Sequence, residues 1–373
     1  MPEGVLTLMF SVTGSLAAYR RAGVYDRFRQ MLRRYTRSFE RVFVCTFDTG
    51  DWTDDLAVPG AIHCGMPAVP FRSALFHLAI PFLHRRLRDT SVVRTFNITG
   101  ALPGLTLRAL AGCPVFVSYG YSLPDFIRAE QGWFKFQLYR AVEQIALASA
   151  DRIICATPPQ REALGRRYGQ DKIVWLPNYV DTERFRPPVA GPARDEPYLL
   201  FVGRLEPQKN LVALLQGLAL ARDRGFDLPL CIAGDGTQRA ELQALAQDQG
   251  LPVVFEGVVP NEALPECYGR AFVFVLPSLY EGLPKALLEA MSSGCACLAA
   301  DIPGIRDVIE HGRNGLLCPP TAAGIAERLL QLRRDNALRR RLGASARQHI
   351  LDHYSMDAVL GREIAILQEA MRW

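Results

Sequence analysis

Short apolar runs rich in β-branched and aromatic residues alternate with amphipathic helical patterns along almost the whole chain. This alternation is typical of parallel sheets, in which a right-handed crossover helix joins each strand to the next. The clearest helical patterns lie at 210–224, 237–249 and 284–293. We expect strands at 5–10, 41–46, 92–96, 114–118, 152–156 and 173–176, and again at 198–202, 229–233, 252–255, 272–276 and 296–300.

The strands form two series, separated by the polar, proline-bearing stretch 187–197, which we interpret as a linker. A chain of 373 residues is also too long for one ordinary core. We therefore expect an α/β protein of two doubly wound, Rossmann-like domains, residues 1–182 and 183–354, with the helix at 355–373 packing back onto the first. Such sheets bind ligands at the carboxyl ends of their strands, so an interdomain cleft is the expected site.

Composition excludes several classes of protein. The first apolar run follows an acid, Glu3, and is too short for a signal peptide, while Pro81 interrupts the apolar stretch 75–83. The nine cysteines form no CxxC pair, which indicates reduced thiols and a cytoplasmic protein. The six histidines are scattered, so no metal site and no cofactor are expected.

Positive charge is concentrated in the first half of the chain. Residues 1–182 carry 22 Lys and Arg against 15 Asp and Glu, whereas residues 183–373 carry 21 against 23. The arginines are interleaved with apolar residues, which fits either a solvated helix or a basic face for anionic lipid headgroups or a phosphorylated acceptor. No nucleic-acid-binding motif accompanies them. Much of the excess lies in Arg20, Arg21, Arg27, Arg29, Arg33, Arg34, Arg37 and Arg41.

Two loops after expected strands have residues suited to a phosphate ligand. In FVGRLEPQKN, Gly203 permits a sharp turn, and Arg204 and Lys209 flank the start of a helix. A guanidinium makes forked contacts to phosphate oxygens, and an ammonium acts as a compact charge. The sequence AGDG around Gly234 lets backbone approach a ligand, or simply makes a tight turn.

The segment PSLYEGLPKALLEAM is the most informative part of the sequence. Pro284 suits the first helical position, so the helix amides and the positive end of its dipole lie beside Gly282. Glu281 precedes this helix and Glu289 lies within it, about 7 Å along the axis from Pro284. Two carboxylates on either side of an anion-binding helix end match a sugar nucleotide, with hydroxyls on both sides of a diphosphate.

Residues 176–320 resemble the retaining nucleotide-sugar glycosyltransferases of family 4, which have the GT-B fold. The resemblance rests on FVGRLEPQKN, IAGDGTQRAEL, the segment FEGVVPNEALPECYGRAFVFVLPSLYEGLPKALLEAMSSGCACLAADIPGIRDVI and HGRNGLLCPP. It also includes LPNYVDTERFRPP, which is similar to that family's interdomain link.

The resemblance implies a role for each matching residue. Arg204 and Lys209 would neutralise the donor diphosphate, Glu281 would hold donor-sugar hydroxyls and Glu289 would bind the ribose. The family's phosphate-binding stretch, whose backbone amides would touch phosphate or sugar, is matched here by Gly282, Leu283, Pro284 and Lys285. Pro284 replaces a glycine of many relatives, so this position has no N–H to donate. The nucleobase would pack near Gly257, Val258 and Val259.

The first half of the chain resembles the family less closely. Gly14 and Ser15 fit a donor-facing loop after the first strand. Many members have a histidine after the fourth strand, where this chain reads Val117-Ser118-Tyr119-Gly120-Tyr121. Either Tyr119 or Tyr121 takes over its sugar contacts, or that histidine is dispensable here.

We therefore expect a metal-independent enzyme that moves a sugar from a UDP or GDP donor to an acceptor hydroxyl with retention. The acceptor is a glycan, a lipid-linked molecule or a small molecule, and the basic half suggests contact with a membrane surface. Two alternatives remain: a sugar-nucleotide epimerase or hydrolase of the same fold, and a catalytically silent GT-B subunit. Asp51, Asp54 and Asp55 are expected to be solvated.

Overall fold

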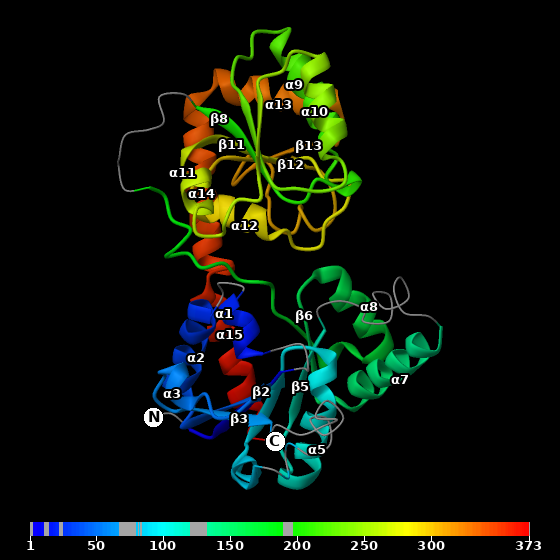
Figure 1. The fold of residues 1–373 in the computed structure, drawn as a ribbon, viewed down its shortest axis with the longest axis vertical. Coiled ribbons are helices and arrows are strands. Elements are labelled where there is room, and N and C mark those ends of the chain that lie inside the picture. Colours follow the sequence, from blue (N-terminus) through cyan, green and yellow to red (C-terminus); the bar gives the residue numbers. More distant parts are fainter. Residues whose placement is uncertain are drawn as a thin grey trace. The chain divides into compact units, whose positions relative to one another are not determined.

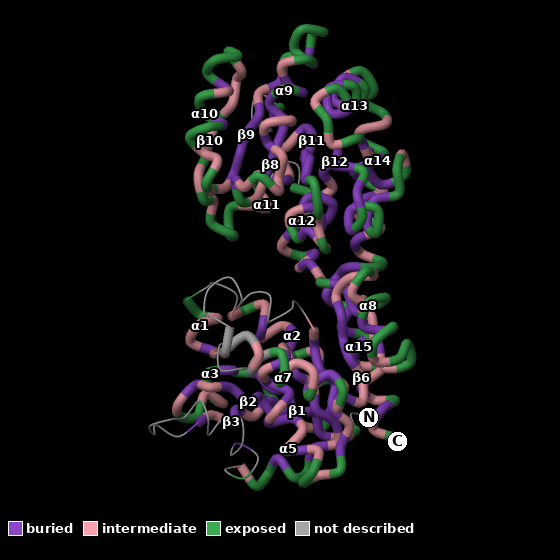
Figure 2. The backbone as a smooth tube through the Cα atoms, turned by 90° about the vertical axis from the view of Figure 1, so that its right-hand side faces the viewer, coloured by how far each residue is buried: buried purple, intermediate pink, exposed green. Residues whose placement is uncertain are grey.

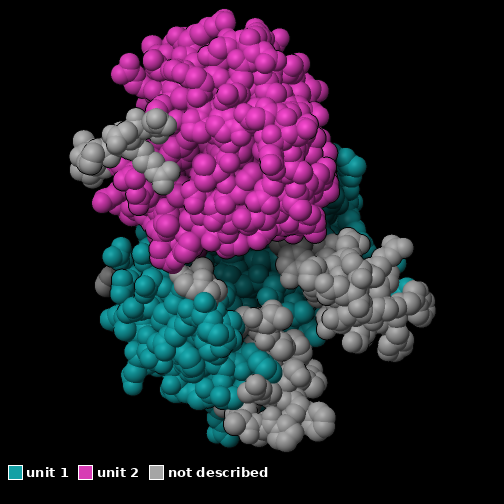
Figure 3. Space-filling model, turned by 45° about the horizontal axis from the view of Figure 1, so that its top comes forward, with its two compact units in different colours: residues 1–177, 360–373 teal, residues 178–359 magenta. Residues whose placement is uncertain are grey.

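The computed structural model describes residues 3–10, 15–21, 25–66, 80, 82, 84–119, 133–188 and 197–372. Its contacts divide the chain into two compact units, residues 1–177 with 360–373, and residues 178–359 (Figure 3). The first division falls inside LPNYVDTERFRPP (176–188), upstream of the expected linker 187–197, of which residues 189–196 lie outside the described part.

Unit 1 is built on a parallel sheet with the strand order β3-β2-β1-β4-β5-β6-β7. β1 is buried along its whole length and β2 along most of it, as expected for strands that helices cover on both faces. The strands are β1 (Val5–Met9), β2 (Arg41–Thr49), β3 (Ala61–Met66), β4 (Val92–Thr95), β5 (Val115–Tyr119), β6 (Arg152–Cys155) and β7 (Ile173–Trp175).

Helices join these strands, and the C-terminal helix contributes its second part to the same unit. That helix is held by a buried ion pair between Arg94 of β4 and Glu363, whose Nε and Oε1 atoms lie 2.5 Å apart. Gln368 also donates to the carbonyl of Ser38. The helices are α1 (Leu16–Arg21), α2 (Tyr25–Ser38), α3 (Thr53–Leu56), α5 (Ala101–Ala111), α7 (Trp133–Ser149), α8 (Pro158–Tyr168) and α15 (Met356–Ala370), with 3-10 turns η1 (Arg85–Asp89), η2 (Ile98–Gly100) and η3 (Gln170–Lys172).

Unit 2 has a second parallel sheet, in the order β10-β9-β8-β11-β12-β13. Its strands meet in one hydrophobic core that extends into the surrounding helices. In Figure 2 the strands β9, β11 and β12 are almost entirely buried, whereas the edge strand β10 is not. The strands are β8 (Tyr198–Val202), β9 (Leu230–Ala233), β10 (Val253–Gly257), β11 (Ala271–Leu276), β12 (Cys297–Ala300) and β13 (Leu316–Cys318).

The helices of unit 2 form two groups with the sheet between them (Figure 1). α9 contacts α10 and α13, whereas α12 contacts α11 and α14. This is the doubly wound arrangement expected from the sequence. The helices are α9 (Leu211–Arg222), α10 (Arg239–Asp248), α11 (Leu264–Arg270), α12 (Lys285–Ser292), α13 (Ala322–Arg334) and α14 (Asn336–His353), with the 3-10 turn η4 (Pro207–Lys209).

The strands expected from the sequence are confirmed, but β3 and β13 were not expected. β3 contains His63 and Gly65, which interrupt its apolar pattern, and β13 is only three residues long. Both lie at an edge of their sheet, next to a single neighbouring strand.

Candidate active site

The strand order of unit 2 reverses beside β8, since β9 lies on one side of it and β11 on the other. Ligands of doubly wound sheets bind at such a point, outside the carboxyl ends of the strands. The loops that leave β8 and β11 there are joined to each other. Leu279 donates its backbone N–H to the carbonyl of Gln208 at 2.9 Å, and the Gln208 side chain donates to the carbonyl of Tyr280 at 2.8 Å.

These loops bring Lys209 and Glu281 together as an ion pair. Lys209 Nζ lies 2.5 Å from Glu281 Oε1, and the two side chains are only 15% and 8% exposed. The buried Ser278 hydroxyl donates to the same oxygen at 2.7 Å. Among the described residues, neither donor reaches Oε2, so this oxygen is the one left to accept from a ligand. The two residues, assigned separate roles from the sequence, thus act as one unit.

A hollow of about 280 Å³ lies at the ends of β8, β9 and β10. Its lining includes Gly203 and the exposed Arg204 of FVGRLEPQKN and Gly234 of AGDG. The segment expected to hold the nucleobase contributes Val258 and Val259. Within the described ranges Arg204 makes no ion pair, so its guanidinium is available to an anion. The lining residues are Val202, Gly203, Arg204, Ala233, Gly234, Asp235, Val258, Val259 and Leu264.

Gly234 allows the loops around this hollow to pack closely. Its N–H donates to the carbonyl of Gly257 at 2.6 Å, and its φ is +147°. A Cβ atom at this position would lie 1.8 Å from the carbonyl oxygen of Gly203. Gly257 is itself left-handed, with φ +70°. No residue with a side chain fits position 234 without moving the backbone.

The entrance to α12 differs from the prediction at one residue. Pro284 was expected at the first helical position, but its ψ of 113° is extended and it caps the helix from outside. The proline ring fixes only φ and leaves ψ free, so Pro284 can adopt this extended conformation. The first helical residue is therefore the exposed Lys285. Gly282 is exposed and Leu283 is partly buried. Gly304 packs against this entrance, because a Cβ atom added to Gly304 would lie 2.3 Å from the carbonyl oxygen of Gly282.

Glu289 of α12 is held by a residue that sequence reasoning missed. Tyr268 of α11 is fully buried and donates its hydroxyl to Glu289 Oε2 at 3.1 Å. Burial raises the pKa of Tyr268 well above its usual value, and the Glu289 carboxylate raises it further. The phenol therefore stays protonated and fixes the orientation of the carboxylate.

Replacing Tyr268 by phenylalanine removes only this hydroxyl. We expect the KM for the donor to rise about tenfold, because a hydrogen bond to a charged group contributes about 1.5 to 3 kcal/mol. The matched control is Tyr198→Phe, which removes a tyrosine hydroxyl that donates to a backbone carbonyl, that of Cys267, instead of to a carboxylate. Steady-state kinetics test this, and an unchanged KM in Tyr268→Phe contradicts the role given to Glu289.

Ser278 and Tyr268 contact the two candidate glutamates but were not identified as functional from the sequence. Ser278 follows β11 and precedes Glu281 by three residues, which is a weak local signal. Tyr268 belongs to an ordinary apolar helix pattern, and its pairing with Glu289 spans two helices. Such contacts between elements leave no periodicity in the sequence.

In unit 1, the structure places two of the four candidates, since Gly14 and Tyr121 lie outside the described residues. Tyr119 ends β5 and is partly buried against the core. The Ser15 hydroxyl accepts from the N–H of Ala18 at 2.9 Å, at the start of α1. The next residue, Leu16, donates to Asp48 Oδ2 at 2.6 Å. Ser15 thus has a role in starting the helix.

A buried chain of polar groups anchors Asp48. The Trp52 N–H donates to His63 Nδ1 at 3.2 Å, so the neutral ring carries its proton on Nε2. Nε2 lies 2.8 Å from the hydroxyl of Thr46, which donates to Asp48 Oδ2 at 2.7 Å. Burial lowers the pKa of His63 below 6.5, although the Asp48 charge opposes this effect.

This histidine makes the stability of unit 1 dependent on pH. The unfolded chain takes up a proton near pH 6.5, whereas folded His63 does so only at lower pH. The free energy of unfolding therefore falls as the pH drops through 6.5. Thermal unfolding at about pH 7.5 and about pH 5 should show a smaller fall for His63→Gln than for the wild type. The pKa of His349 in unit 2 is also lowered by burial, and its contribution remains in both proteins. Equal falls contradict the prediction.

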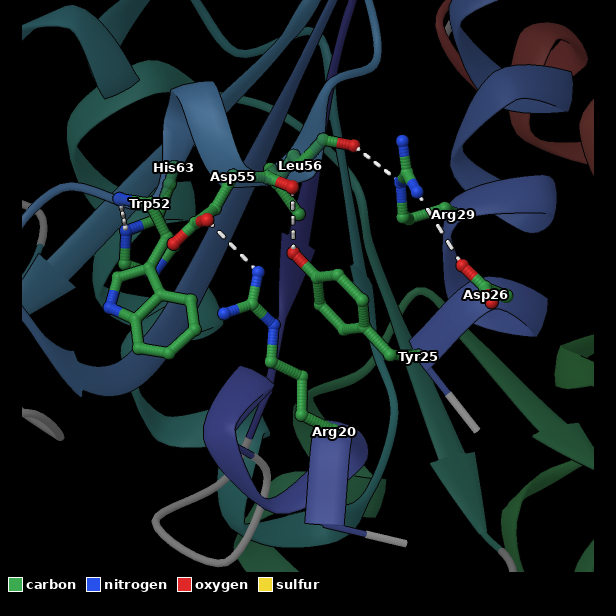
Figure 4. A network of polar contacts seen from close by, with 8 residues as sticks. All are labelled: Arg20, Tyr25, Asp26, Arg29, Trp52, Asp55, Leu56 and His63. Atoms are coloured by element: carbon green, nitrogen blue, oxygen red, sulfur yellow. Dashed lines mark hydrogen bonds and ion pairs between the residues drawn. The ribbon is translucent and has the colours of Figure 1, made fainter. Parts of the chain in front are cut away.

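Several residues of the basic and acidic clusters are paired rather than simply solvated (Figure 4). Arg20 lies between the rings of Tyr25 and Trp52 and pairs with Asp55 at 2.9 Å. Arg29 donates to the carbonyl of Leu56 at 2.8 Å. Asp51 is exposed, as expected, and its carboxylate also accepts from the hydroxyl of Thr53 at 2.6 Å. The contacts of Arg20 and Arg29 fasten α1 and α2 to α3.

Two features of the described residues concern metals and membranes. In that part of the chain, no three His, Cys, Asp or Glu side chains gather in a group able to hold a metal ion. Its helices also include none with the length and apolarity required to cross a bilayer.

Two family models together match most of the chain. The model described as "Glycosyl transferases group 1" matches residues 183–349, and "Glycosyl transferase 4-like domain" matches residues 22–179. The α-maltose-1-phosphate synthase of Mycolicibacterium smegmatis is 30% identical over 65% of this chain and 69% of its own length. The chain belongs to the family 4 glycosyltransferases.

Other curated relatives match this glycosyltransferase over about half of their length. The α-D-kanosaminyltransferase of Streptomyces kanamyceticus is 30% identical over 61% of this chain and 54% of its own. The D-inositol 3-phosphate glycosyltransferase of Nocardia farcinica is 33% identical, over 56% of this chain and 50% of its own.

Solved structures show that the fold is GT-B. A glycosyltransferase from Rickettsia africae superposes with a TM-score of 0.74 at 14% identity, over 100% of this chain and 99% of the other. Alr3699/HepE from Anabaena, solved in complex with UDP, gives a TM-score of 0.71 at 15% identity, over 98% and 100%. The fold class expected from the sequence is confirmed.

Proposed function

We propose that the protein transfers a sugar from a nucleoside-diphosphate donor to an acceptor hydroxyl, with retention at the anomeric carbon. One observation carries the proposal: the Lys209–Glu281 pair lies at the strand-order reversal, where the adjoining loop also carries the exposed Arg204. Cations and a carboxylate at this position suit a diphosphate linked to a polyol.

Charge separation in the reaction explains the roles of these groups. As the glycosidic bond breaks, positive charge grows on the sugar and negative charge on the leaving diphosphate. Arg204, the remaining N–H groups of Lys209 and the N-terminus of α12 stabilise the diphosphate, a contribution that is usually the largest in such reactions. Glu281 Oε2 accepts from a donor-sugar hydroxyl, and Glu289 accepts from the ribose. The leaving phosphate takes the acceptor's proton.

The proposal for the nucleotide and for the metal requirement rests on the same site. The hollow between β8, β9 and β10 holds the nucleobase and ribose side of the donor, and Alr3699/HepE has been solved with UDP. We propose a UDP or GDP donor and no metal, because the cations supply the charge that a divalent ion would supply. Transfer that persists in EDTA supports this, and transfer abolished by EDTA and restored by Mg²⁺ contradicts it.

A panel of UDP- and GDP-sugars tests the proposal by thermal shift. A donor at a hundred times its Kd adds about 2.7 kcal/mol, which raises the Tm of a domain of this size by about 5 to 10 °C. Donors that bind are then incubated with and without candidate acceptors, and NMR of the product reports its anomeric configuration. Donor turnover without an acceptor indicates an epimerase or hydrolase instead. An inverted product overturns retention, and binding by no donor overturns the proposal.

A further inference from the structure

Asn210 occupies an unusual backbone conformation directly after Lys209. Its φ of 56° and ψ of 39° are left-handed. Among the described residues other than glycine, it shares a positive φ only with Ala57. Asparagine tolerates this region better than most residues, so the backbone selects for glycine or asparagine here.

The side chain of Asn210 supplies what glycine lacks. Its Nδ2 donates to the carbonyl of Pro277 at 3.1 Å and to that of Pro320 at 3.0 Å. These carbonyls belong to the loops that follow β11 and β13, whereas Asn210 itself ends the loop that follows β8. A single amide therefore joins three loops at the carboxyl edge of the sheet and uses both of its N–H groups.

We propose that Asn210 is the positioning residue for the Lys209–Glu281 pair, an inference that rests on the proposed function. Lys209 is its neighbour in the chain, and Pro277 begins the loop that carries Glu281. The lysine stem is flexible, so the ammonium and the carboxylate keep their 2.5 Å contact only when both loops are held. A neutral amide is required, because a carboxylate at this position would face two carbonyl oxygens.

The test compares Asn210→Gly and Asn210→Asp with Asn314→Asp. Glycine keeps the left-handed backbone and loses both hydrogen bonds, whereas aspartate keeps the shape and loses the donors. Asn314 is the control, because it is also a buried asparagine whose Nδ2 donates to a backbone carbonyl, that of Val308, at 3.1 Å. It lies before the first residue of β13, away from the carboxyl ends of the strands.

We expect kcat to fall about 10- to 100-fold in both Asn210 variants. The Kd of UDP or GDP, whichever stabilises the wild type, should change less than about threefold, since the nucleotide binds mainly at the hollow. Asn314→Asp should lower Tm and leave kcat unchanged.

A second readout does not depend on activity. The coupling between Lys209 and Glu281, measured by a double-mutant cycle in unfolding, should fall by at least half in the Asn210→Gly background. Unchanged coupling in the Asn210→Gly background overturns the inference, and so does an unchanged kcat in the Asn210 variants. A loss of kcat in Asn314→Asp equal to that in Asn210→Asp also overturns it. A wild type that binds and transfers nothing overturns the proposed function, and the coupling measurement then decides the role of Asn210 on its own.

Discussion

Replacing Lys209 by alanine is expected to lower kcat about 10²- to 10³-fold, and replacing Glu281 by alanine should have an effect of the same size. Each substitution removes a group that contacts the reacting end of the donor. It also leaves the partner as an unpaired buried charge, which costs about 3 to 5 kcal/mol of stability. Activity and stability therefore fall together in either single variant.

The double variant Lys209→Ala/Glu281→Ala separates the two effects. Removing both charges leaves neither buried alone, so stability recovers toward that of the wild type while transfer stays lost. The pair Asp301–Arg306 is the matched control, because it joins neighbouring loop residues at 2.6 Å but is exposed. Arg306→Ala should change stability by less than about 1 kcal/mol and leave kcat unaltered. Wild-type transfer rates in any Lys209 or Glu281 variant, measured with a verified acceptor, would remove the basis for the proposed function.

Gly234→Ala is expected to cause a large loss of stability, about 3 to 5 kcal/mol. The added methyl group would lie 1.8 Å from the carbonyl oxygen of Gly203, and a φ of +147° is unfavourable for any residue with a Cβ atom. Relief requires the loops after β8 and β9 to separate, which also displaces Arg204 and weakens nucleotide binding.

Gly250→Ala is the control for this substitution. Gly250 also has a positive φ, +57°, but no atom lies within 4 Å of the position its Cβ would take. Its loss should be limited to the backbone cost of about 1 to 2 kcal/mol. Urea unfolding of both variants measures the difference, and equal losses show that the close approach of Gly203 and Gly234 does not matter.

The positions of the candidate residues could be predicted because each motif directly follows a strand. Val202 and Leu276 end apolar runs, so Arg204, Lys209 and Glu281 had to lie at the carboxyl edge of a parallel sheet. The partners of these residues could not be predicted. Lys209 and Glu281 are 72 positions apart, and their contact depends on β8 and β11 being neighbours.

The sequence by itself determined the two parallel sheets, most of their strands and the family. Strands buried on both faces appear as continuous apolar runs, and the family motifs are short contiguous segments, so both can be recognised from neighbouring residues. Only the tertiary structure decided that Lys209 pairs with Glu281, that Tyr268 holds Glu289 and that Asn210 joins three loops. It also decided that Pro284 stands outside α12. The physical reason is that these contacts depend on strand order and on hydrogen-bond geometry between distant segments, and neither of these produces a local periodicity.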